Sequence, residues 1–216
     1  MNRRSLLLLP GAALASCTRI FYATSKKLGK EKRDILVSRV KDARKDQTEA
    51  KEQFQSTLEA FQAVTGFQGG KLEDTYKKLN KEFERSEGRA QDVSNRVESI
   101  EKVAHDLFRE WNQEIDQIGD RSLKAQSRTL LRATERRYET LASKMKDSER
   151  RMKPVLQAFR DQVLFLKHNL NARAIQSLKD TSIRIDKDVT ALLGEMDASI
   201  READAFIATM AKEEAS

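Results

Sequence analysis

The sequence predicts an all-α protein, an elongated antiparallel bundle or coiled coil of about four long helices. Charged residues make up 35% of the 216 residues, and both signs are common, with 41 basic and 34 acidic side chains. Only 8 glycines and 2 prolines are present, too few for the frequent turns of a β-sandwich or barrel. Apolar residues recur at alternating steps of three and four, which is the period of an α-helix.

Four apolar stripes define the expected helices. Each begins and ends on an apolar residue, and the stripes cover residues 36–64, 72–118, 130–170 and 175–210. Pro154 lies inside the third stripe, where we expect it to kink the helix because it removes one backbone hydrogen bond. Short connections between long helices make neighbours in sequence antiparallel neighbours in space.

The expected reversals lie where the stripes break. The glycine-rich segment 66–70 predicts the first turn. Gly119 is expected to cap the second helix at its C-terminus, and Asp120 to cap the third at its N-terminus. The third reversal is expected at 168–172, and 179–182 is the alternative position.

Residues 1–16 have the pattern of a signal peptide, with two arginines followed by a short apolar run. This run is too short to span a bilayer. The residues Leu14-Ala15-Ser16-Cys17 resemble a bacterial lipobox, which implies lipidation of Cys17 after cleavage. The alternative is an ordinary secretory signal followed by a chance cysteine. Cys17 is the only cysteine, so no disulfide can form within the chain.

The resemblance to a lipobox predicts a lipoprotein of the bacterial cell envelope. Thr18 follows the cysteine. In bacteria that use this position as a retention signal, an aspartate would keep the protein at the inner membrane. We therefore expect an outer-membrane lipoprotein that faces the periplasm, and the inner membrane is the alternative.

The net positive charge is concentrated beside the expected anchor. Residues 17–33 form an expected juxtamembrane linker that contains one acidic residue and six basic ones: Arg19, Lys26, Lys27, Lys30, Lys32 and Arg33. The expected bundle domain, 34–216, sums to zero charge. The linker is expected to contact anionic lipid headgroups, and a solvated spacer is the alternative. A neutral body gives no indication of nucleic-acid binding.

Few residue patterns indicate catalysis. The segment 65–72 resembles a phosphate-binding loop but has Thr65 and Leu72 where such a loop needs glycine and a hydroxyl residue. We predict no metal site, because the chain lacks the paired Glu-x-x-His motifs of helical-bundle metal proteins. Trp111 lies on the second stripe, where core packing is expected, and a partner-binding patch at the end of the bundle is the alternative.

A polar group at the expected third reversal is a possible partner contact. It consists of His168, Asn169, Asn171 and Arg173. Turns need such residues for structural reasons as well, so both interpretations stand.

Two segments resemble a bacterial family that is described only as domain of unknown function 2959. These are Lys32-Arg-Asp-Ile-Leu-Val-Ser-Arg-Val40 and the seventeen residues from Phe159 to Ile175. The likeness runs from about Ile20 to Met210. The resemblance implies a helical envelope protein, and it supplies no reaction and no catalytic residues.

These observations predict a lipid-anchored periplasmic bundle that acts as an envelope scaffold or adaptor. We expect no catalysis, no cofactor, no small-molecule substrate and no nucleic acid. The expected partners are the membrane, through the anchor, and other envelope proteins or a second copy. The alternative is a protein whose amphipathic helices bind lipid or a membrane surface. Exposed apolar surface would distinguish this alternative, because a bundle that buries its stripes offers lipid nothing.

Overall fold

The computed structural model describes the backbone of residues 15–215 and the side chains of residues 32–213, apart from residue 180. Most of the expected signal peptide therefore lies outside the described residues. The described part of the chain contains four helices and no strand, which confirms the all-α class. The helices are α1 (Ala15–Thr65), α2 (Leu72–Gln117), α3 (Arg121–His168) and α4 (Ala172–Ala215).

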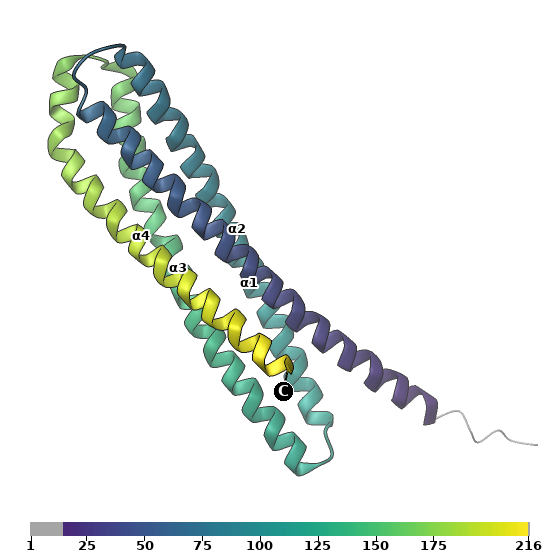
Figure 1. Cartoon of the computed structure of the whole chain (residues 1–216). Coiled ribbons are helices and arrows are strands. Elements are labelled where there is room, and N and C mark those ends of the chain that lie inside the picture. The colour runs from purple at the N-terminus through teal and green to yellow at the C-terminus, as the bar shows by residue number, and fades with distance from the viewer. Residues whose placement is uncertain (1–14, 216) are drawn as a thin grey trace, which may run out of the picture.

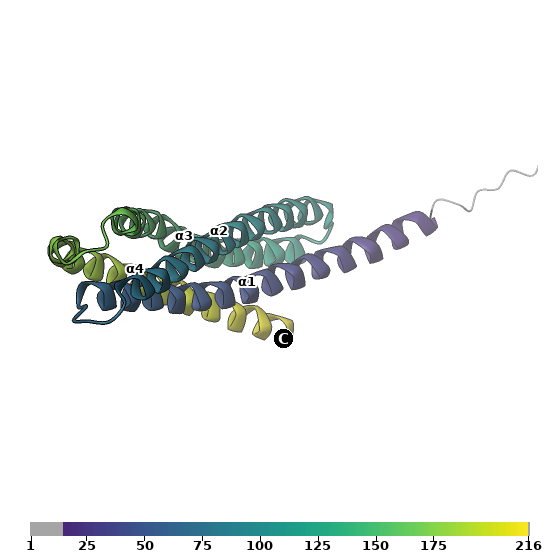
Figure 2. The ribbon, with the colours of Figure 1, turned by 90° about the horizontal axis from the view of Figure 1, so that it is seen from above.

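The four helices form a long, narrow antiparallel bundle (Figure 1). Helix α1 packs against α2 and α4, and α3 packs against the same two helices. Each helix therefore has two neighbours. Figure 2 shows the same rod from above, with the α1–α2 connection at one end and the N-terminal part of α1 at the other.

Ion pairs between neighbouring helices show which parts of those helices lie side by side along the rod. Lys51 on α1 reaches Asp197 on α4 at 2.6 Å, and Arg89 on α2 reaches Glu49 on α1 at 2.7 Å. Their side chains are partly exposed, so each pair adds little stability. The pairs connect oppositely charged faces and so favour this arrangement of helices over others.

The predicted apolar stripes face one another in a single core. Phe61 on α1 and Phe159 on α3 are fully buried and meet edge to face, with 6.1 Å between ring centroids. Buried leucine, isoleucine, valine and methionine side chains from all four helices surround them. Leu130 and Leu170 were expected in the third stripe, but they are 51% and 36% exposed.

The first turn falls where the glycines predict it. Helix α1 ends at Thr65 and α2 begins at Leu72. Gly70 has a φ of +102°, a conformation that side-chain-bearing residues rarely adopt, so glycine is required there. The turn therefore depends on backbone freedom more than on side-chain contacts.

The second turn confirms one predicted cap and corrects the other. Asp120 caps α3, because its carboxylate accepts a 2.9 Å hydrogen bond from the backbone N–H of Leu123. The prediction that Gly119 caps α2 is wrong. The C-cap is Ile118, whose N–H donates to the carbonyl of Ile115 at 3.2 Å, and Gly119 does not take a left-handed φ.

The third reversal lies at 168–172, as predicted. Helix α3 ends at His168 and α4 begins at Ala172. The alternative position, 179–182, is wrong because those residues lie inside α4. Helix α3 continues without interruption through Pro154.

Helix α1 is one continuous element from Ala15 to Thr65. The expected linker at 17–33 is therefore helical and joins the bundle domain without a break at residue 33. Figures 1 and 2 both show this end of α1 diverging from the other helices and projecting past them. None of the helices, within the described residues, has the length and apolar character needed to cross a membrane.

Candidate functional site

The side chains of all four helices meet at the point where α1 leaves the bundle. We call this group the clamp, and it holds charged residues of both signs around one indole ring. It consists of Lys32, Arg33, Glu110, Trp111, Arg137 and Glu213.

A single carboxylate on α4 binds two arginines at the clamp. The Arg33 guanidinium on α1 donates to Glu213 Oε2 at 3.0 Å, and Arg137 on α3 donates to Glu213 Oε1. The Glu213 side chain is 20% exposed. Charge-assisted hydrogen bonds in such partly buried surroundings are stronger than neutral ones, so Glu213 connects three helices. Lys32 adds an ion pair from α1 to Glu110 on α2.

The indole of Trp111 packs under the same arginine. The guanidinium carbon of Arg33 lies 5.1 Å from the centroid of the indole, within the range of a cation–π interaction. At the edge of the ring, Trp111 Nε1 donates a 3.0 Å hydrogen bond to Ser127 Oγ on α3. The ring is half-buried, so Trp111 packs inside the bundle and contributes to the clamp.

An aromatic pair closes the core just inside the clamp. The rings of Phe108 on α2 and Tyr138 on α3 meet edge to face at 5.5 Å between centroids. Burial, with a smaller contribution from Glu101, raises the pKa of Tyr138 to about 12. Burial, together with the nearby Glu110, also raises the pKa of Glu114 above its ordinary value.

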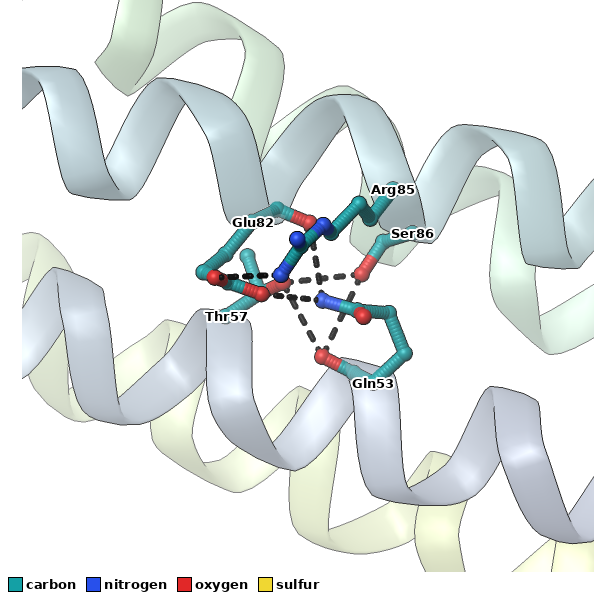
Figure 3. Close-up of polar contacts among 5 residues, drawn as sticks. All are labelled: Gln53, Thr57, Glu82, Arg85 and Ser86. Atoms are coloured by element: carbon teal, nitrogen blue, oxygen red, sulfur yellow. Dashed lines mark hydrogen bonds and ion pairs between the residues drawn. The ribbon is translucent and has the colours of Figure 1, made fainter.

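A second polar cluster joins α1 to α2 farther along the rod (Figure 3). Gln53 Nε2 donates to Glu82 Oε2 at 2.8 Å and to the Glu82 carbonyl at 3.1 Å. The hydroxyls of Thr57 and Ser86 lie 2.8 Å apart, and Thr57 Oγ1 also lies 2.9 Å from the Glu82 carbonyl. Arg85 pairs with Glu82 at 3.0 Å. The cluster connects α1 to α2, and its side chains bond to one another and to backbone carbonyls.

The expected anchor and its basic neighbours fall on the projecting part of α1. Their backbone is helical, and their side chains lie outside the described residues: Cys17, Arg19, Lys26, Lys27 and Lys30. The remaining two members of the basic set, Lys32 and Arg33, are held in the clamp. The bundle therefore neutralises part of the charge that we expected to face the membrane.

Two of the four polar residues at the third reversal cap helices. Asn169 Nδ2 donates to the Phe165 carbonyl at 2.9 Å, and Asn171 Oδ1 accepts from the Ala174 N–H at 3.0 Å. His168 and Arg173 are exposed. Capping therefore accounts for both amides, and a partner contact at this end stays a prediction.

Sequence reasoning missed three members of the clamp, Glu110, Arg137 and Glu213. The third helix carries an excess of basic residues and its neighbours an excess of acidic ones, which indicates charge pairing without saying which residues pair. Among the described residues, no group of three or more histidine, cysteine or carboxylate side chains is placed to hold a metal ion. The ion pairs and the cation–π contact of the clamp can fix the angle at which α1 leaves the bundle.

The fold and the clamp define a class, the elongated helical-bundle proteins in which one terminal helix projects past the bundle. The sequence profile of one family, described as "Protein of unknown function (DUF2959)", matches residues 21–210. The chain belongs to this family, and the match confirms the resemblance seen in the two sequence segments. No curated protein and no solved structure matches the chain.

Proposed function

We propose that this protein is a lipid-anchored scaffold or adaptor of the bacterial envelope. One observation carries the proposal: α1 runs from the expected lipidation site into the bundle as a single helix. About 48 residues separate Cys17 from Thr65, and at 1.5 Å per residue they span about 70 Å. An anchor at Cys17 would therefore hold the opposite end of the rod at a defined distance from the membrane.

The closed core favours a scaffold over a protein that binds lipid by opening. The apolar stripes of all four helices pack together, with Phe54, Leu141 and Leu192 fully buried. Opening the bundle would expose this surface, at a cost of about 25 cal/mol per Å² of apolar area. The lipid-handling alternative needs a source for that energy.

The far end of the rod is the proposed site of partner contact. Leu164, Phe165 and Leu170 are 52%, 40% and 36% exposed near the third reversal. The exposed His168 and Arg173 lie beside them. Apolar and polar side chains together at one end of a rigid rod suit a protein partner.

Metabolic labelling with palmitate tests the anchor. Wild-type protein in its native envelope should incorporate the label, and Cys17→Ala should not, because the thiol is the atom that is acylated. The variant should accumulate as a precursor or as a soluble periplasmic form. Absence of label from the wild type would contradict the lipoprotein proposal.

Site-specific photo-crosslinking tests the adaptor role. A photoreactive residue at position 168 should give discrete adducts in intact cells, and one at exposed position 151 in the middle of α3 should not. Dependence of the adducts on Cys17 would show that anchoring positions the contact. Equal adduct patterns from both positions would contradict a partner site at the far end.

A further inference from the structure

Each helix of the bundle has an irregular residue near the middle of the rod. Helix α2 contains Gly88, α3 contains Pro154 and α4 contains Gly194. These are the only glycines and the only proline inside those three helices. Helix α1 contributes Gln47, a polar residue that is 2% exposed. We call these four residues the joint.

The ion pair between Arg89 and Glu49 aligns α2 with α1 at the joint. Their side chains meet at 2.7 Å. Arg89 follows Gly88 directly, and Glu49 is two residues from Gln47. Because successive residues of a helix are 1.5 Å apart along its axis, Gly88 and Gln47 lie at nearly the same level.

Helices α3 and α4 reach this level through two further ion pairs. Glu87 pairs with Arg160 on α3, six residues beyond the proline of the joint. Lys51 pairs with Asp197 on α4 at 2.6 Å, three residues beyond the glycine of the joint. The four joint residues therefore lie within two or three helical turns of one another. All four helices run side by side at this level (Figure 1).

The core at the joint contains polar atoms that have no partner. Neither amide atom of Gln47 is bonded, and the same holds for the hydroxyls of Ser148 and Ser199, which are 0% and 1% exposed. Within the described side chains, the only other buried nitrogen or oxygen without a partner is Nε of Arg33, at the clamp. Such atoms destabilise the closed core and regain hydrogen bonds with water when it opens.

The backbone of three helices is weakened at the same level. Gly88 and Gly194 are exposed, and the space that a β-carbon would occupy is open at both. Packing therefore does not require glycine there, and the flexible backbone weakens each helix. Pro154 has no N–H, so the carbonyl of Arg150 lacks its helical partner. Helix α1, in contrast, has no glycine or proline at 30–65.

We infer that the joint is a flexible point of the rod, where α2, α3 and α4 open locally while the core on either side stays packed. Helix α1 continues through it as an unbroken spine, and long helices can curve without breaking. The inference goes beyond the proposed function and does not depend on it. In an anchored scaffold, bending at the joint would change the direction of the far end while α1 maintains the length.

Amide hydrogen exchange tests local opening, with residues 17–216 carrying Cys17→Ser as the protein. Helices that fray from their ends are most protected in the middle. The joint predicts the reverse: amides at 86–94, 150–158 and 190–198 should exchange roughly tenfold faster than those of the same helices at 100–107, 138–145 and 203–210. Protection that rises from the helix ends to a maximum at the joint would overturn the inference.

Filling the glycines tests the cause of this opening. Gly88→Ala with Gly194→Ala should slow exchange at the joint by roughly two- to fivefold in each helix, because alanine stiffens the backbone. The control is Thr129→Ala with Thr140→Ala, two exposed positions of α3 away from the joint. It raises helix propensity by a similar amount and should leave the joint unchanged. Equal slowing in both variants would show that these amides exchange only by global unfolding, which contradicts a local joint.

Removing the unpaired polar atoms tests the core side of the joint. Gln47→Met with Ser199→Ala should also slow exchange there, because opening no longer gives water access to those atoms. The matched control is Thr57→Val with Ser86→Ala, a fully buried pair whose hydroxyls lie 2.8 Å apart. It should not slow exchange, since these hydroxyls are already bonded. Circular dichroism verifies that each variant is folded, and slowing by both pairs or by neither would overturn the inference.

Discussion

The guanidinium of Arg33 lies 5.1 Å from the ring centroid of Trp111 and donates to Glu213 at the same time. The planar guanidinium of this α1 residue thereby contacts α2 through its face and α4 through its N–H edge. This geometry needs a planar cation, which lysine does not supply. The direction in which α1 leaves the bundle therefore depends on this arginine.

Removing Arg33 should loosen the exit of α1. Arg33→Ala should lower the free energy of unfolding by about 1–3 kcal/mol, since it removes a charge-assisted hydrogen bond and a cation–π contact. Arg39→Ala changes an exposed arginine on the same helix and should cost under about 0.5 kcal/mol. Urea melts measure both. Equal losses of unfolding free energy in the two variants would mean that the clamp contacts of Arg33 add no more stability than an exposed arginine does.

Truncating the core should be costly wherever the stripe is buried. Leu107→Ala should lower the unfolding free energy by about 2–5 kcal/mol, because Leu107 is 2% exposed. Lys102→Ala, on the exposed side of α2, should cost under about 0.5 kcal/mol. Arg96 also lies off the stripe, but it pairs with Asp46 at 2.8 Å on α1 and is a poorer control. Similar melts for Leu107→Ala and Lys102→Ala would contradict the helix register.

Replacing Gln47 with an apolar residue should make the protein more stable. Its side chain is 2% exposed, and neither Oε1 nor Nε2 has a hydrogen-bond partner among the described residues. Gln47→Met keeps the volume and removes the buried polar atoms, so it should raise the unfolding free energy by about 1–3 kcal/mol.

Gln53 on the same helix is the matched control. Its amide bonds to Glu82, so Gln53→Met should destabilise the protein by about 1 kcal/mol. Thermal melts that move in the same direction for both variants would contradict this difference.

The stabilising contribution of Glu82 should be lost in acid. The hydrogen bond from Gln53, with a smaller contribution from Arg85, lowers the pKa of Glu82 below its ordinary value of 4.5. A lowered pKa in the folded state stabilises the protein above 4.5, and this contribution is lost as the pH falls through the folded-state value. The stability advantage of wild type over Glu82→Gln should therefore shrink below pH 4.5.

Carboxyl titration by NMR separates this effect from general acid unfolding. The midpoint of Glu82 should rise toward 4.5 in Gln53→Leu, because the largest cause of the shift is then gone. An unchanged midpoint would show that Gln53 does not set the pKa of Glu82.

The predicted turns and stripes follow from local rules, which is why the sequence was sufficient for them. Glycines at 66–70, the Asp120 cap and the register skip near 170 each act within a few residues of the chain. The helical period then assigns most core positions, apart from the ends of the third stripe and the half-buried ends of the second, Leu72 and Ile118. Leu130 fits that period as well as Leu131 does, and only Leu131 is covered.

By itself the sequence determined that this chain is helical, where it reverses and which faces are apolar, because those properties depend on neighbours along the chain. Tertiary structure alone decided that Arg33 and Arg137 share Glu213, and that Leu123 and Leu130 are left exposed. Each of these depends on the level at which distant helices pack against one another. Glu213 reaches Arg33 and Arg137 because α4 packs beside both α1 and α3 at the clamp, and no local pattern in any one helix encodes that level.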